Sequence, residues 1–219
     1  MATEREINKY KPAYEPVSQR EPTALERKVD SSFMQFMEKE IAIESDVEMR
    51  RRDEVLAQVR DLFLAWVKEV GVKELKMTPE DAEDAGGQMF ISGSHRLGVR
   101  DVGADIDAVC VAPSFCLREH FFSSLRDMLR RRPEVTELVA AEDAFVPLLS
   151  FDFSGVSIDL LFARLASPLV PKDLDILEDS VLQGLDDASV VSLNGPRVTN
   201  MIFRLVGEAA FPSFLVVLR

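Results

Sequence analysis

Two aspartates one residue apart, at the start of an apolar run, constrain this chain more than any other feature. In an extended strand, residues i and i+2 point to the same face, so we expect Asp105 and Asp107 to project side by side. Residues 108–112 (AVCVA) are apolar and β-prone, which predicts a buried strand that begins at the pair. Two neighbouring carboxylates resist ionising together unless a cation lies between them. The pattern therefore predicts a cation-dependent site at one end of a buried strand.

A turn of small residues lies roughly a dozen positions upstream of the pair. Residues 88–92 read as a strand, and Gly93 and Ser94 follow it before a short helix predicted at 95–99. Small side chains and free backbone N–H groups are the material of phosphate-binding turns. The turn and the aspartate pair together indicate metal-assisted phosphoryl or nucleotidyl transfer.

A third carboxylate stands in a later strand. Residues 146–153 and 156–163 read as strands joined by a hairpin at Ser154 and Gly155. In the second strand Asp159 is a lone carboxylate, and its face is opposite to that of Ile158 and Leu160. A buried strand aspartate is usually structural, and an Asp-x-Asp pair alone is a weak motif. Three such carboxylates, however, supply the oxygen ligands that two hard divalent cations need.

Composition narrows the class of protein. The 219 residues are 47% hydrophobic, enough for a substantial core, and their formal net charge of −12 argues against a large nucleic-acid surface on this chain by itself. Cys110 and Cys116 are too few for a disulfide framework and are expected to pack as small hydrophobes. No run approaches the ~20 apolar residues that span a bilayer, and no signal peptide is visible, so we expect a soluble, intracellular protein.

Helical patterns flank the predicted strands. Apolar residues recur at helical spacing from residue 23 to Gly71, which predicts two long amphipathic helices whose apolar stripes are core; the first stripe is Leu25, Val29, Phe33, Phe36 and Met37. Residues 72–87 read as a loop, 117–131 as a helix, 194–196 as a turn and 197–206 as a helix. The basic runs 50–52 and 130–132 are expected to be solvated helix ends.

Five segments in this order resemble one known family. They are 92–99 (SGSHRLGV), 103–113 (GADIDAVCVAP), 144–147 (AFVP), 158–165 (IDLLFARL) and 192–199 (SLNGPRVT). Together they resemble the signature of eukaryotic poly(A) polymerases of the nucleotidyltransferase superfamily, and the likeness extends roughly over residues 22–206.

The resemblance implies an α+β fold, a mixed nucleotidyltransferase (polymerase β-like) sheet flanked by helices. It also implies an organisation in four parts. Residues 1–22 would be an extended arm, 23–54 a helical segment that packs on the central domain, 55–165 the catalytic domain, and 166–219 the truncated start of a helical central domain.

The resemblance further implies transfer of AMP from ATP to an RNA 3′ end, in the nucleus, alongside proteins of the 3′-end processing complex. Asp105, Asp107 and Asp159 would bind two Mg²⁺ or Mn²⁺ ions. Together with these aspartates, the nucleotide would contact Ser92, Gly93, Ser94, Asp101, Ile106 and Asn194.

Three positions depart from the family pattern. Ser92 and His95 stand where an aromatic residue and a Tyr are usual, and Asp101 places an extra carboxylate near the expected triphosphate. Two alternatives stay open: a non-catalytic fragment that binds RNA-processing partners, and a related nucleotidyltransferase with another base or acceptor.

Overall fold

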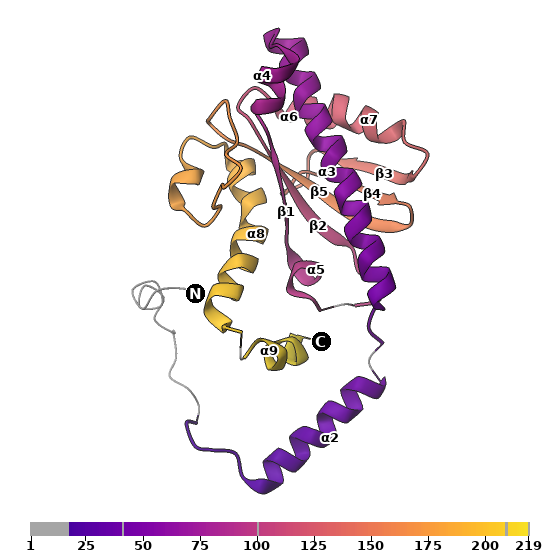
Figure 1. Ribbon diagram of the computed structural model, residues 1–219, viewed down its shortest axis with the longest axis vertical. Coiled ribbons are helices and arrows are strands. Elements are labelled where there is room, and N and C mark those ends of the chain that lie inside the picture. The colour runs from indigo at the N-terminus through magenta and orange to yellow at the C-terminus, as the bar shows by residue number, and fades with distance from the viewer. Residues whose placement is uncertain (1–17, 41, 100, 209, 219) are drawn as a thin grey trace.

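The computed structural model describes residues 18–218 except 41, 100 and 209; residues 1–17, most of the predicted arm, lie outside it. Helices begin and end the described chain, and the strands lie between them (Figure 1). The helices are α2 (Ala24–Glu40), α3 (Asp46–Leu75), α4 (Pro79–Asp84), α5 (Gly93–Leu97), α6 (Arg118–His120), the π-helix η1 (Phe121–Leu125), α7 (Arg126–Arg130), the 3₁₀ helix η2 (Asp179–Leu182), α8 (Asp187–Val206) and α9 (Phe211–Leu218). The strands are β1 (Gln88–Ile91), β2 (Ile106–Ala112), β3 (Val135–Ala141), β4 (Leu148–Phe153) and β5 (Val156–Arg164).

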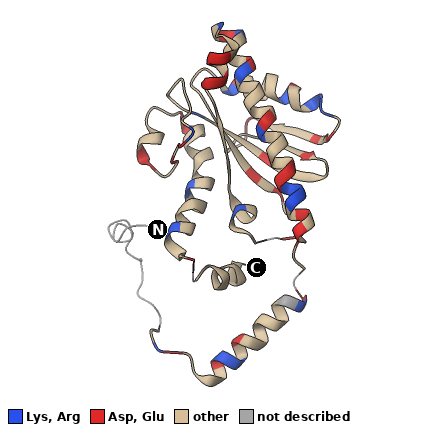
Figure 2. Cartoon of the chain, in the orientation of Figure 1, with Lys and Arg blue, Asp and Glu red and all other residues tan. Residues whose placement is uncertain are grey.

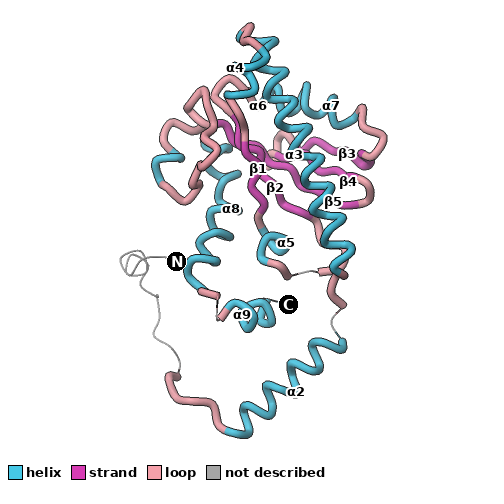
Figure 3. The backbone as a smooth tube through the Cα atoms, in the orientation of Figure 1, coloured by secondary structure: helices cyan, strands magenta, loops and turns pink. Residues whose placement is uncertain are grey.

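The strands form one mixed sheet in the order β1-β2-β5-β4-β3 (Figure 3). β2 and β5 are parallel, while β1 pairs antiparallel with β2, and β4 pairs antiparallel with both β5 and β3. A parallel pair needs a crossover connection, and here the chain between β2 and β5 contains the helices α6 to α7 and the strands β3 and β4. The predicted α+β fold with a mixed sheet is confirmed.

The main core lies between α3 and one face of the sheet. Trp66 on α3 is fully buried and meets Phe162 of β5 edge to face, with ring centroids 6.0 Å apart. Phe121 of η1 stacks on the same Phe162 ring at 5.0 Å. The apolar stripe predicted between residues 55 and 70 is therefore core, because its large side chains fill the space over β2 and β5.

A second, smaller cluster covers the other face. Val109 and Val111 of β2 and Ala163 of β5 pack against Leu193 of α8. Because side chains alternate along a strand, the residues of β2 and β5 with odd numbers face α8, and those with even numbers face α3. This alternation decides which side of the sheet carries each aspartate.

The first apolar stripe does not join either core. α2 projects away from the sheet in Figure 1, and Leu25, Val29, Phe33 and Phe36 are 48% to 71% exposed. The prediction that this stripe is core is wrong within the described residues. Helical periodicity shows that one face is apolar, but it does not say what covers that face.

Several boundaries differ from expectation because tertiary packing overrides local signals. Residues 194–196 lie inside α8 rather than in a turn, and Gly195 is tight against the β1–α5 connection, since a Cβ there would be 3.0 Å from Ser92 Oγ. α3 continues past Gly71, where a Cβ would be 3.2 Å from that of Ala82 in α4. The loop expected at 72–87 contains α4, whose first turn is capped by Thr78.

The sequence pattern also missed one edge strand. β3 shows no clean alternation of buried and exposed residues, its register shifts between Thr136 and Val139, and Glu137 has a positive φ of 54°. An irregular edge strand of this kind lacks the period-two signal.

The cysteine and membrane expectations can be compared with the described part of the chain. Cys110 and Cys116 are both free and fully buried, as expected for packing residues. No described helix is long and apolar enough to cross a membrane.

Candidate functional site

Two of the three predicted aspartates are direct neighbours across a parallel strand pair. Asp107 on β2 is the register partner of Asp159 on β5. Both have odd numbers in strands whose odd positions face α8, so both lie on that side of the sheet. Asp105 immediately precedes β2 and is exposed, whereas Asp107 and Asp159 are half-buried. The β2–β5 pairing brings carboxylates 52 residues apart in sequence to neighbouring positions on one face of the sheet.

Gly93 and Ser94 were predicted to precede a helix at 95–99, but they form the first turn of α5, and this Gly-Ser turn lies directly against Asp107. The Ser92 N–H donates to the Asp107 carbonyl oxygen at 2.9 Å, which extends the β1–β2 pairing by one residue. Gly93 has a φ of +66°, and a Cβ at this position would overlap Asp107 Oδ2. Glycine is required here for two reasons, since it tolerates the left-handed backbone and leaves room for the carboxylate.

The charge state of Asp107 reflects this crowding. Burial raises the pKa of the Asp107 carboxyl, and the negative charges of Asp105 and Asp159 raise it further. Each carboxylate thus makes ionisation of Asp107 harder. A bound cation would lower the pKa of Asp107 again by stabilising its ionised form. The electrostatics of the site therefore favour binding of positive charge.

A pocket of about 520 Å³ opens between the sheet and α8 beside Asp107. Among the predicted site residues, Ser92, Gly93, Asp107 and Asn194 line it. Sequence reasoning did not single out Thr199, which also lines this pocket and accepts a hydrogen bond from the Gly93 N–H at 3.3 Å. Thr199 could have been found from the sequence, because it ends the segment 192–199, one of the five that resemble the family signature. This pocket brings the turn, one aspartate and α8 together.

The remaining predicted residues do not line this pocket, and Asp105 and Asp159 are among them. Ser94 is in the first turn of α5 and is half-buried. Ile106 is fully buried in the core on the α3 side, so only its backbone faces the aspartates. Asp101 is exposed in the loop before β2, where it forms an isolated antiparallel bridge with Ile43.

The aspartates offer donors that suit a hard cation. Mg²⁺ and Mn²⁺ prefer carboxylate oxygens, and the three side chains supply only such oxygens. As they are arranged here, the described residues contain no group of three or more His, Cys, Asp or Glu side chains that could hold a metal ion. The metal site therefore stays a prediction, supported by donor chemistry and by the raised pKa of Asp107.

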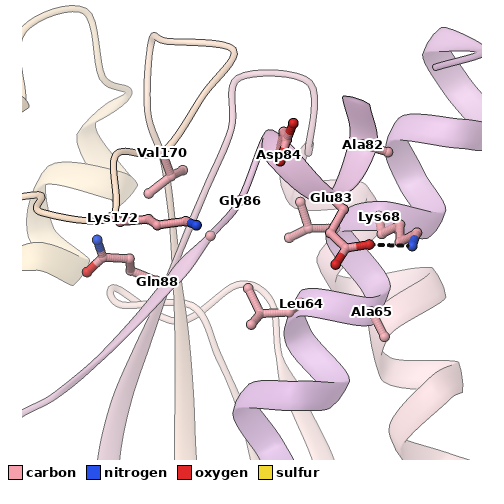
Figure 4. A pocket seen from close by; sticks show the side chains of 12 residues that line it. Leu64, Ala65, Lys68, Ala82, Glu83, Asp84, Gly86, Gln88, Val170 and Lys172 are labelled. Carbon is pink, nitrogen blue, oxygen red and sulfur yellow. Dashed lines mark hydrogen bonds and ion pairs between the residues drawn. The ribbon is translucent and has the colours of Figure 1, made fainter. Parts of the chain in front are cut away.

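A second pocket, of about 650 Å³, lies at the far end of β1 (Figure 4). It is lined by α3, α4 and the segment around Val170, and the ion pair between Lys68 Nζ and Glu83 Oε2 at 2.8 Å crosses one wall. The Gln88 amide, labelled in Figure 4, donates to the Pro171 carbonyl oxygen. None of the predicted site residues lines this pocket, so it is separate from the aspartate site.

Comparisons with known proteins agree with the motifs. A model of the poly(A) polymerase nucleotidyltransferase domain matches residues 14–206. Poly(A) polymerase pla1 of Schizosaccharomyces pombe is 40% identical over 195 residues, which are 89% of this chain and 34% of that protein. Nuclear poly(A) polymerase 2 of Arabidopsis thaliana is 42% identical over 193 residues, 88% of this chain and 24% of that protein. The chain thus spans about a quarter to a third of the curated relatives it matches.

Solved structures show a more distant likeness. A structure of Cid1, described by its RNA terminal uridylyl transferase activity, superposes with a TM-score of 0.45 and 14% identity over 62% of this chain and 37% of Cid1. The family assignment instead depends on the domain match, which extends over most of the chain and includes the aspartates, the Gly-Ser turn and α8. The resemblance seen in the motifs is therefore confirmed, and the chain belongs to the poly(A) polymerase nucleotidyltransferase domain family.

Proposed function

We propose that this chain carries the nucleotidyl-transfer site of a poly(A) polymerase, which transfers AMP from ATP to an RNA 3′ end without a template. The observation that carries the proposal is the pairing of Asp107 with Asp159 at the α8 side of the sheet, with the Gly93 turn in contact with Asp107. The domain match and the curated relatives named poly(A) polymerase support the same activity.

Asp105, Asp107 and Asp159 would hold two Mg²⁺ or Mn²⁺ ions. Such ions, when bound, promote deprotonation of an attacking hydroxyl and neutralise charge on phosphate oxygens. The protein's own contribution is to hold Asp107 and Asp159 side by side on two paired strands, with Asp105 directly before the first of them. Burial and, to a smaller extent, the charges of Asp105 and Asp159 raise the pKa of Asp107, which supports a site where a bound cation is favourable.

The turn would hold the triphosphate of ATP. Gly93 allows the backbone to approach Asp107 closely, and the backbone N–H groups and the Ser94 hydroxyl are donors suited to phosphate oxygens. Asn194 on α8 would face the base or the primer, since it lines the pocket beside Asp107 and is exposed. The backbone of Ile106 and the exposed Asp101 would lie at the edge of this site.

The departures from the family pattern have structural counterparts. Ser92 is buried and Gly195 of α8 closes over it, so its side chain contributes packing rather than an aromatic wall. The side chain of His95 is 10% exposed, and burial lowers its pKa, with Arg52 lowering it further. A neutral His95 at pH 7 adds no positive charge for the triphosphate.

The proposal extends to partners and location. The RNA 3′ end and ATP would be the substrates, and proteins of the 3′-end processing complex would be partners. A curated relative is named a nuclear poly(A) polymerase, which supports a nuclear location. The net charge of −12 makes a large RNA-binding surface on this chain alone unfavourable, and Figure 2 shows acidic residues interspersed with the basic ones along α3. The RNA affinity of this chain alone is therefore expected to be weak.

The test is extension of a labelled oligo(A) primer by the purified chain with ATP and Mg²⁺ or Mn²⁺, beside Asp107→Asn. Binding of a non-hydrolysable ATP analogue is measured in the same buffers. We expect cation-dependent nucleotide binding that Asp107→Asn abolishes, and any extension should disappear with it. Primer extension by Asp107→Asn, or nucleotide binding of equal affinity with and without the divalent cation, would refute the assignment of a nucleotidyl-transfer site. Competition among all four nucleotides would reveal a different base preference.

A second candidate, a non-catalytic role in binding RNA-processing proteins, is favoured by the exposed stripe on α2. Leu25, Val29, Phe33 and Phe36 present an apolar face of a kind that marks interaction surfaces. Sedimentation of the purified chain distinguishes the two. A clean monomer would count against this role, and concentration-dependent association lost in Phe33→Ser would support it.

A further inference from the structure

We propose that the buried ion pair between Glu44 and Arg52 positions Asp105, because it holds the backbone of the loop 101–104 against the start of α3. The proposal rests on the proposed function, in which Asp105 is a cation ligand. Glu44 and Arg52 would be positioning residues, since they act through the loop and do not reach the substrate themselves.

The pair itself is unusual for this chain. Arg52 Nη2 lies 2.6 Å from Glu44 Oε1, and the two side chains are 7% and 8% exposed. In every other ion pair between described residues, at least one side chain is 39% exposed or more. A buried ion pair adds little net stability over well-packed apolar residues, so its presence calls for another explanation. One such explanation is that the ion pair fixes the conformation of nearby backbone, and the hydrogen bonds of the pair identify this backbone as the loop 101–104.

Both partners bond to consecutive residues of the loop. Arg52 Nη1 donates to the Ala104 carbonyl oxygen at 2.7 Å, and the Gly103 N–H donates to Glu44 Oε1 at 3.3 Å. Asp105 follows Ala104 directly in the chain. The Ile43–Asp101 bridge joins the same two segments at the other end of the loop. The ion pair therefore determines where the backbone lies immediately before Asp105.

Apolar packing does not hold this loop. Val102 is 64% exposed, Gly103 is exposed with open space around it, and Asp101 is exposed. Asp107 and Asp159, by contrast, are held by the strand ladder. Of the three aspartates, Asp105 is thus the one whose position depends on polar contacts of a loop. Within the loop the Ala104 N–H donates to the Asp101 carbonyl oxygen at 3.2 Å, and Glu44 and Arg52 provide the side-chain contacts directly before Asp105.

The preceding residue on α3 offers a matched control. Arg51 also donates a hydrogen bond to a backbone carbonyl, that of Ser154, at the β4–β5 turn rather than at the Asp105 loop. Arg51→Lys and Arg52→Lys therefore make the same chemical change, one helical position apart, and only the second loosens the loop. Lysine keeps the positive charge, but its single ammonium nitrogen cannot reproduce the two hydrogen bonds that the planar Arg52 guanidinium donates to Glu44 and to the Ala104 carbonyl oxygen.

The experiment combines Mn²⁺ binding to the full chain with hydrogen exchange of the loop. We expect Arg52→Lys to weaken Mn²⁺ about tenfold and to speed amide exchange at residues 101–105 about tenfold, while Arg51→Lys changes neither. In the Asp105→Asn background, Arg52→Lys should have no further effect on Mn²⁺. Glu44→Gln, which keeps the shape of the acceptor, replaces Arg52→Lys if the latter does not fold.

The outcomes separate the two hypotheses. If the losses of Mn²⁺ affinity from Arg52→Lys and Asp105→Asn multiply, Arg52 does not act through Asp105 and the inference is overturned. It is equally overturned if loop exchange is unchanged in Arg52→Lys. A chain that binds no Mn²⁺ at all, yet shows the loop exchange effect, would refute the proposed cation site while leaving the loop attachment established.

Discussion

Replacing Gly93 by alanine tests the contact on which the candidate site depends. The new Cβ would be 3.5 Å from Asp107 Cγ and would overlap Oδ2, and the backbone would keep a φ of +66°. The left-handed conformation costs a non-glycine residue about 1–2 kcal/mol, and overpacking adds about 1–3 kcal/mol. We expect a total loss of about 2–5 kcal/mol in the free energy of unfolding. At this chain length, each kcal/mol lost lowers the melting temperature by about 2–4 °C.

Gly98→Ala is the matched control, because Gly98 has a φ of +80° and no atom within 4 Å of the position a Cβ would take. It should cost only the conformational strain, about 1–2 kcal/mol. Any gain from a stiffer unfolded chain is common to both variants and cancels in the difference. Urea unfolding gives both stabilities, and Mn²⁺ binding shows whether the Asp107 carboxylate has moved. Equal stability losses together with equal Mn²⁺ affinities would refute the close approach.

Three further predictions concern stability and reactivity. Asp107→Asn should stabilise the metal-free protein at neutral pH. The pKa of Asp107 in the native state is raised above 3.8, so the folded protein favours the protonated carboxyl. The resulting stabilisation is full below the pKa of the unfolded state and is lost as the pH rises through the native pKa. Ser124→Ala leaves the buried Trp66 N–H, which donates to Ser124 Oγ at 2.8 Å, without its partner and should cost about 1–3 kcal/mol in urea unfolding. Cys110 and Cys116 should resist alkylation in the native protein, because burial raises the pKa of the Cys116 thiol to about 12 and that of Cys110 well above its usual value.

Each of these predictions has a control. The advantage of Asp107→Asn should shrink near pH 4, and a constant advantage at every pH would contradict the electrostatic reason. Ser123→Ala, at the exposed neighbouring position, should change stability by no more than about 0.5 kcal/mol, and an equal loss in both serine variants would show that the indole bond contributes nothing. Both thiols should react after denaturation, and rapid labelling of the native protein would contradict their burial.

The strands that carry the aspartates were predictable because their signal is local. β2 is a continuous apolar run, and β5 alternates buried and exposed residues around Asp159. By contrast, the continuation of α8 through Pro196 was not predictable, since contacts with the β1–α5 connection override a strong turn signal.

The candidate site divides in the same way. The Gly-Ser turn and the three aspartates were identified from residue type and spacing, because metal and phosphate chemistry restricts which side chains can serve. Glu44 and Thr199 were not singled out, because each matters through a hydrogen bond to a distant backbone N–H, to Gly103 and Gly93 respectively. Arg52 was expected to be a solvated helix end, but it is buried. Its partner, Glu44, lies before α3, so the helical spacing of residues within α3 does not reveal the ion pair.

The family, the aspartates and the strand that holds Asp107 could be predicted from residue identity and short periodic patterns. The register pairing of Asp107 with Asp159, the burial of Arg52 and the exposure of the α2 stripe could be seen only in the folded chain. The physical reason is that register and burial are set by contacts between segments far apart in the chain. A local pattern can show that a face is apolar or that a strand forms, but its partner is chosen only when the whole sheet and its covering helices assemble.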